Sequence, residues 1–105
     1  MKTEARSIET QQRLTAALVR ISNLAYIAWN VRPLDHETTP EFQAAVEAIS
    51  AGIDGDEKFN SYVGELLGQI GTSGILAIPS RKITGVQGIM DLCRKIEGYL
   101  DRNYS

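Results

Sequence analysis

The single histidine of this chain, His36, lies between two carboxylates in the order Asp35-His36-Glu37. A histidine titrates near neutral pH, and adjacent carboxylates tune its proton affinity, so this triplet has the composition of a general base. Arg32 adds a cation in the same segment. The sequence supplies no plausible nucleophile or metal partner for His36, however. We therefore predict a non-enzymatic protein and keep an activity centred on His36 as the minor alternative.

The acidic segment that begins at Asp54 resembles a calcium loop in its spacing. Asp54, Asp56 and Glu65 fit positions 1, 3 and 12 of an EF-hand loop. However, Lys58 occupies position 5, where an oxygen ligand is needed, and Phe59 occupies position 6, where the turn glycine is needed. One histidine and one cysteine are also too few for a zinc site of the usual kind. We predict no metal and no cofactor, and we interpret one of the two aspartates as a helix cap.

Cys93 lies between Met90 and Ile96 on the apolar face of a predicted helix. A buried thiol of this kind acts as a small hydrophobic side chain, and no basic neighbour on that face would activate it. A single cysteine cannot form an internal disulfide, which agrees with a reducing compartment. The first residues also lack the apolar core and cleavage site of a secretory signal, so we expect a cytoplasmic protein.

Glycines recur in the second half of the chain, but no strand and no Gly-Lys-Ser/Thr ending accompany them, as a phosphate loop would require. Glycine is costly inside a helix, so a packing reason is expected. We predict that Gly64 and Gly68 allow close helix contact, against Gly85 and Gly88. The turn at residues 71–74 remains a candidate for binding an anion through its backbone amides.

The apolar pattern predicts four helices in one all-α domain that spans residues 1–105. The first should run from Thr3 to Val31 and is apolar on nearly all sides around residues 24–29. Arg32-Pro33 ends it. Short connections favour antiparallel neighbours and hence a four-helix up-down bundle.

Capping signals set the bounds of the other predicted helices. Thr39 should cap the second helix, which Gly52 ends in a left-handed conformation. The third helix should end at Gly71, and Ser80 or Thr84 should cap the last one. The apolar face of this last helix is expected to comprise Ile83, Val86, Met90, Cys93, Ile96 and Leu100.

The predicted topology brings residues 29–39 and 71–82 to one end of the bundle. A small anionic ligand would bind there, and its candidate residues are Trp29, Arg32, Gly71, Thr72, Ser73, Gly74, Arg81 and Lys82. An aromatic pair beside an arginine also has the composition of a protein-binding hot spot. The candidate residues for a protein partner are Tyr26, Trp29, Glu37, Asp54 and Glu57.

Charge is distributed unevenly, with +2 on residues 1–31, −6 on residues 32–79 and +2 on residues 80–105. This distribution argues against nucleic-acid binding and leaves room for a basic protein partner. Arg20, Ser22, Asn23 and Asn30 interrupt the apolar run of the first helix, so we predict no membrane span.

The first helix carries more apolar surface than three shorter helices should cover, so we expect at least a homodimer with this helix in the interface. We predict a small acidic bundle that self-associates and binds or inhibits a macromolecular partner. Immunity proteins, antitoxins and phage-encoded inhibitors share this size and lack of catalytic residues. The alternative is a binder or sponge for an anionic metabolite or nucleotide.

The predicted lack of a metal site is directly testable. Treatment with a chelator should leave the thermal unfolding transition of the chain unchanged, because the ligand sets at 54–65 and at His36 are incomplete. Calorimetry with and without added calcium or zinc measures this, and a rise of more than a few degrees with either ion would contradict the prediction.

Overall fold

The computed structural model describes residues 8–75 and 86–104 and contains four helices, with no strand in those ranges. They are α2 (Ile8–Asn30), α3 (Thr38–Ser50), α4 (Glu57–Ser73) and α5 (Val86–Asn103). The all-α bundle predicted from the sequence is confirmed. Residues 3–7 of the predicted first helix lie outside the described ranges, as do Ile83, Gly85 and the proposed caps Ser80 and Thr84.

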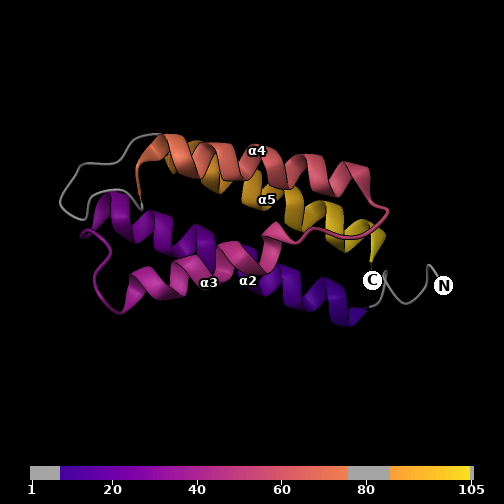
Figure 1. Cartoon of the computed structure of the whole chain (residues 1–105), viewed down its shortest axis with the longest axis horizontal. Coiled ribbons are helices and arrows are strands. Elements are labelled where there is room, and N and C mark those ends of the chain that lie inside the picture. The colour runs from indigo at the N-terminus through magenta and orange to yellow at the C-terminus, as the bar shows by residue number, and fades with distance from the viewer. Residues whose placement is uncertain (1–7, 76–85, 105) are drawn as a thin grey trace.

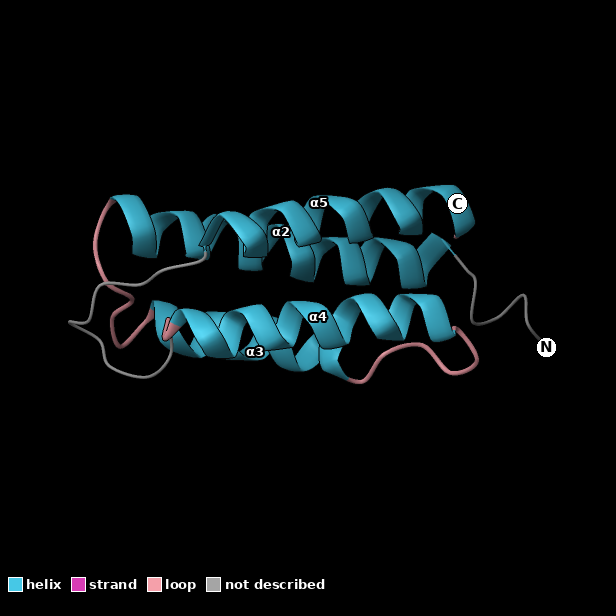
Figure 2. Cartoon of the chain, turned by 90° about the horizontal axis from the view of Figure 1, so that it is seen from above, coloured by secondary structure: helices cyan, strands magenta, loops and turns pink. Residues whose placement is uncertain are grey.

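The helices form two layers, one of α2 and α5 and the other of α3 and α4 (Figures 1 and 2). Helix α2 packs against α3 and α5, and α4 packs against the same two neighbours. In Figure 1 the ribbons of consecutive helices run in alternating directions along the long axis of the molecule. The last turns of α2 and α4 therefore lie at the same end.

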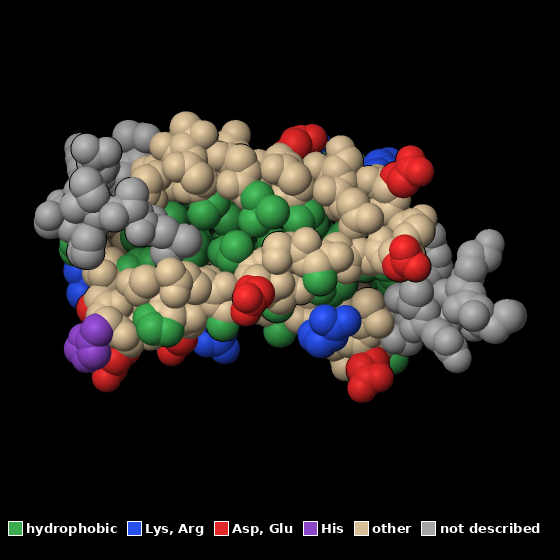
Figure 3. All heavy atoms as spheres, in the orientation of Figure 1, with side chains coloured by type: hydrophobic (Ala, Val, Ile, Leu, Met, Phe, Trp, Pro, Cys, Tyr) green, Lys and Arg blue, Asp and Glu red, His purple; other side chains and the backbone are tan. Residues whose placement is uncertain are grey.

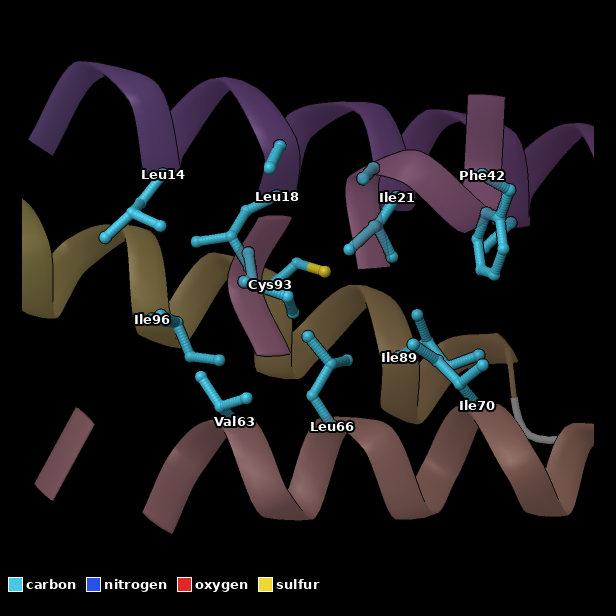
Figure 4. Close-up of a cluster of buried hydrophobic side chains, with 14 of the residues drawn as sticks. Leu14, Leu18, Ile21, Phe42, Val63, Leu66, Ile70, Ile89, Cys93 and Ile96 are labelled. Carbon is cyan, nitrogen blue, oxygen red and sulfur yellow. The ribbon is translucent and has the colours of Figure 1, made fainter. Parts of the chain in front are cut away.

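The core fills the space between the two layers. Leu18 and Ile21 of α2 meet Leu66 of α4 and Ile89 of α5 there (Figure 4), and all four are fully buried. Cys93 points into this cluster, and burial, followed by the nearby Glu97 carboxylate, raises the pKa of its thiol to about 12. The prediction that Cys93 lies in the core is confirmed.

Two aspartates start the second and third of these helices. Asp56 caps α4, because its carboxylate accepts the amide of Phe59 at 3.0 Å, as the acidic segment predicted. The predicted cap of α3 was wrong. That helix begins at Thr38, one residue before Thr39. Its N-cap residue Glu37 makes no side-chain cap, and the Asp35 carboxylate accepts the amides of Glu37 and Thr38.

The glycines divide into those that end helices and those that leave a surface open. Gly52 has φ +70° just after α3, as predicted, and an added Cβ would lie 2.3 Å from Asn60 Oδ1. Helix α4 does not end at Gly71, because it continues to Ser73 and uses Gly74 (φ +77°) as its left-handed cap. The predicted close packing at Gly64 and Gly68 is not found, since among the described residues no atom outside the helix's own backbone lies within 4 Å of a Cβ added at either.

The open glycines of α4 yield a stability prediction. Gly64→Ala and Gly68→Ala should each raise the free energy of unfolding by about 0.5–1 kcal/mol, because alanine loses less backbone entropy in a helix and meets no atom here. Gly88→Ala should raise it less, because its Cβ would lie 2.8 Å from Gln69 Oε1 and the exposed Gln69 side chain would have to move aside. Urea unfolding measures all three. A loss of stability in the first two would show that another surface packs on this face of α4.

Candidate docking face on helix α2

The loop after α2 uses its charged residues to start α3. Asp35 Oδ1 accepts the amides of Glu37 and Thr38 at 2.9 and 2.8 Å, and the Asp35 amide donates to the Thr38 hydroxyl at 2.8 Å. The Arg32 guanidinium donates to Asp35 Oδ2 at 2.8 Å. The hydrogen bonds from Thr38 and Glu37, with a smaller contribution from Arg32, hold the pKa of Asp35 well below its usual range. Arg32 is thus engaged by a capping carboxylate.

His36 is exposed on the same loop. It borders a shallow hollow together with Leu34, Asp35, Thr39 and Pro40. Among the described residues, no group of three or more His, Cys, Asp or Glu side chains is placed to hold a metal ion. The only described carboxylate that lines this hollow is that of Asp35, which already accepts the amides of Glu37 and Thr38. The geometry adds no support to chemistry at His36.

The turn predicted to bind an anion is the carboxyl end of α4. Thr72 is exposed, but Ser73 is buried, where its hydroxyl donates to the Ile70 carbonyl at 2.8 Å and accepts the Ile75 amide at 3.2 Å. The Gly74 amide donates to the Gly71 carbonyl at 3.4 Å. A helix carboxyl end presents carbonyls and negative partial charge, which repels an anion. The expected set of open amides is not formed, and Arg81 and Lys82 lie outside the described residues.

The acidic candidates for a protein partner do not form one patch. Glu37 directly precedes α3, whereas Asp54 and Glu57 follow it, so the length of α3 separates them. All three side chains are exposed. Tyr26 and Trp29 lie elsewhere again, on α2. The structure brings together only the two aromatic members of this predicted set.

Large hydrophobic side chains that remain exposed in the described ranges all lie on α2 or directly after it. Val19 is 41% exposed, Tyr26 50% and Trp29 42%, and Ile8 and Val31 mark the two ends of the same stretch. Helical periodicity places Val19, Tyr26 and Trp29 on one side of α2, away from the core. We define the outer face of α2 as the exposed residues on this side of the helix, namely Ala16, Val19, Asn23, Tyr26, Trp29 and Asn30, none of which carries a charge.

The first half of this face borders a groove shared with α3. Val19 and Asn23 line it from α2, and Arg20 and Glu41 form an ion pair of 3.1 Å across it. The groove has a volume of about 520 Å³. Towards α3 it adjoins a smaller hollow of about 290 Å³ whose small lining residues are Ala16, Ala17, Ala44, Ala45 and Ala48.

The second half of the face turns towards α5. Tyr26 and Trp29 line a hollow of about 370 Å³ there, together with Val86 and Met90 at the start of α5. Both aromatic side chains also extend into solvent, given their exposed fractions. The outer face therefore carries a hollow of small side chains towards its beginning and two large aromatic side chains towards its end.

A buried polar cluster at the other end of the bundle was not predicted. Asp56 is 4% exposed, and its carboxylate accepts hydrogen bonds from the hydroxyls of Tyr99 (2.8 Å) and Tyr104 (2.5 Å). These bonds join the start of α4 to the end of α5. All three side chains are buried, so the cluster has no access for a substrate and serves the fold. Asp56 was recognisable as a cap, but no local signal pairs it with residues more than 40 positions away.

A second apolar area lies between α3 and α4. Figure 3 shows hydrophobic side chains along the furrow between these two helices, which pack less extensively than the other neighbouring pairs. Val46 and Leu67 are half-buried residues of these helices that pack against the core. No large hydrophobic side chain of α3 or α4 reaches the exposure of those on α2. The outer face of α2 is thus the stronger candidate.

Comparison with known proteins supplies no relative. No family model matches the chain, and no curated protein or solved structure resembles it closely enough to indicate a relationship. No helix in the described ranges has the length and apolarity that crossing a membrane demands.

The capping role of Asp35 predicts a pH-dependent effect. Its folded-state pKa lies below the ordinary value, so its stabilising contribution is complete above about pH 4 and is lost as the pH falls through the lowered value. Asp35→Ala should lower the melting temperature at pH 7, and the difference from the wild type should shrink on acidification. His36→Ala, the neighbouring exposed control, should leave the melting temperature unchanged. Equal losses in both variants would contradict the assignment.

Proposed function

We propose that this protein is a non-enzymatic protein–protein interaction domain that binds through the outer face of α2. The main support for this proposal is that the exposed large hydrophobic residues in the described part of the chain all lie on α2 or directly after it. Tyrosine and tryptophan dominate the binding energy of protein interfaces because they bury large areas at low entropic cost. Scattered single hydrophobic residues are ordinary on a surface, but a shared helical side is typical of a docking site.

The chemistry of the face also supports a protein partner. Its six residues are uncharged, and depletion of charge is the compositional mark of an interface core. The two charged residues that line its groove, Arg20 and Glu41, pair with each other at 3.1 Å and form a polar border. Burying this face would therefore remove apolar surface from water without stranding an unpaired charge.

The binding of a small anion has weaker support. Arg32 is engaged by Asp35, Ser73 is buried, and the backbone of residues 71–74 presents a helix carboxyl end. An anionic metabolite would need open amides or unengaged cations at this end. Binding, or inhibition, of a protein remains the function that the described surface favours, in the cytoplasm as the sequence leads us to expect.

Charge substitutions on the face test this proposal. Val19→Asp combined with Tyr26→Asp should abolish the complexes that the wild-type chain forms, since two carboxylates would have to be desolvated in the interface. Native mass spectrometry of the affinity-purified chain reports its copy number and any retained protein. Both positions are exposed, so the melting temperature should change little.

Gln43→Asp is the matched control, because Gln43 is exposed on α3 and borders neither groove beside the outer face. It should leave every complex intact. The proposal fails if the wild type and the double variant show the same copy number and retain the same proteins.

A further inference from the structure

We propose that the furrow between α3 and α4 binds a cationic amphipathic helix of a partner protein. This inference goes beyond the proposed function, because it concerns a second surface on the layer of the bundle opposite α2. The furrow differs from the outer face of α2 in the charge around it. Its floor is apolar and its surroundings carry charge of one sign, so this surface indicates the chemistry of its partner.

The α3 side of the furrow follows from the way in which that helix uses its two flanks. One flank faces α2, where Ala44 and Ala48 line the alanine hollow. The opposite flank therefore faces α4. Helical spacing places four residues on it, three exposed and one half-buried, namely Gln43, Val46, Glu47 and Ser50.

Helix α4 divides between its neighbours in the same way. Tyr62 packs edge-on against Tyr99 of α5, with ring centroids 5.9 Å apart, so this flank is covered. The Asn60 side chain lies on the flank towards α3, since it bonds the amide and the carbonyl of Ile53 at 2.8 and 3.0 Å in the turn after α3. The residues that share this flank are Asn60, Gly64, Leu67 and Gly71.

The furrow has an apolar floor and a low wall. Val46 and Leu67 pack half-buried against the core, and Figure 3 shows the hydrophobic side chains between the two helices. Gly64 and Gly71 are exposed, and no described atom outside the helix's own backbone lies within 4 Å of a Cβ added at either. A wall without side chains lets a third helix approach at the short end of interhelical distances, about 8 Å between axes.

The charge of this layer gives the sign of the partner. Residues 37–75 contain seven carboxylates and one cation, Lys58, whereas α2 and α5 together contain five cations and four carboxylates. Asp56 is buried, and Glu41 pairs with Arg20. The remaining five carboxylates are exposed and form no ion pair within the described part of the chain, namely Glu37, Glu47, Asp54, Glu57 and Glu65.

Four of these carboxylates are spread along the furrow. Glu37 directly precedes α3, Glu47 lies on its furrow flank, and Asp54 and Glu57 lie at the far end. Charges so far apart do not suit a compact cation, but they suit a rod that carries cations on successive turns. A helix as long as the 13 residues of α3 extends about 20 Å and would span them.

The partner that fits is therefore a helix with an apolar stripe and flanking lysines or arginines. Its stripe would cover Val46 and Leu67, as in other complexes in which a helix binds a groove. Its cations would lie beside the carboxylates, which steer the encounter and select against acidic partners. The same carboxylates repel nucleic acid and anionic lipid surfaces, so a basic protein helix is the class that this surface favours.

A synthetic helix tests the proposal on the full-length chain. The probe is a fluorescent, hydrocarbon-stapled peptide of about 15 residues with leucines on one stripe and lysines beside it, since an unstapled helix of this length is marginal. One matched probe carries glutamate in place of every lysine, and another scrambles the order so that the stripe is lost. Fluorescence anisotropy at low salt should show saturable binding of the first probe and about tenfold weaker binding of the other two.

Charge reversals locate the binding surface. Glu47→Lys combined with Asp54→Lys should weaken binding about tenfold, because two attractions become repulsions. Glu65→Lys combined with Asp101→Lys changes the net charge equally but lies away from the furrow, so the affinity should change less than about threefold. All four positions are exposed, and the melting temperatures of both chains should stay near that of the wild type.

Thiol protection reports the position of the bound probe. Ser50→Cys is exposed on the furrow flank of α3, and its alkylation should slow when the probe is bound. Ala44→Cys is exposed on the same helix but towards α2, and its alkylation rate should not change. The native Cys93 does not interfere, because it is fully buried.

Several outcomes would overturn the inference. These are equal binding of the lysine and glutamate probes, equal losses in the two charge-reversed chains, and unprotected alkylation of Ser50→Cys. A homodimer that the Glu47→Lys/Asp54→Lys chain loses in sedimentation would show a second copy in the furrow and would also overturn it. The Val19→Asp/Tyr26→Asp chain should bind the lysine probe at least as tightly as the wild type, so failure at one surface is distinguishable from failure at the other.

Discussion

A helix in a four-helix bundle can bury only the part of its circumference that faces its two neighbours, and α2 is apolar over a wider arc than that. Leu18 and Ile21 lie on the inward side of α2 and pack in the core, where both are fully buried. Helices α3 and α5 cover the flanks. Val19, Tyr26 and Trp29 are left on the outside, and the features of the candidate site follow from this excess.

Polar contacts elsewhere in the bundle connect its helices, and none of these contacts involves the outer face of α2. Asp35 starts α3 and engages Arg32, while Asp56 joins the start of α4 to the end of α5 through Tyr99 and Tyr104. Both aspartates lie at helix starts, where a carboxylate is favoured by free amides and by the helix dipole. Asp35 and Asp56, two of the residues that suggested chemistry in the sequence, therefore support the architecture, while the uncharged side of α2 stays exposed.

Local signals predicted most of the fold. The cap at Asp56, the left-handed Gly52 and the buried Cys93 each depend on neighbours within a few positions. The start of α3 was predicted at the wrong residue because Thr39 is a good cap by residue type, whereas the path of the loop lets Asp35 accept the amides of Glu37 and Thr38. The helix contacts predicted at Gly64 and Gly68 were not found, because periodicity places glycines on one face of a helix but does not show what packs against that face. For the site, periodicity grouped Tyr26 with Trp29, but the alanine-lined groove beside them requires α3 in place.

Trp29 is the only tryptophan of the chain, and it lies on the outer face, so its fluorescence reports directly on whether that face becomes covered. The most direct measurement is the emission maximum and acrylamide quenching of the wild-type chain over a dilution series. The account predicts a blue shift and stronger protection from quenching as the concentration rises, with both changes lost in the Val19→Asp/Tyr26→Asp chain. Emission and quenching that stay constant across the series would contradict self-association through α2.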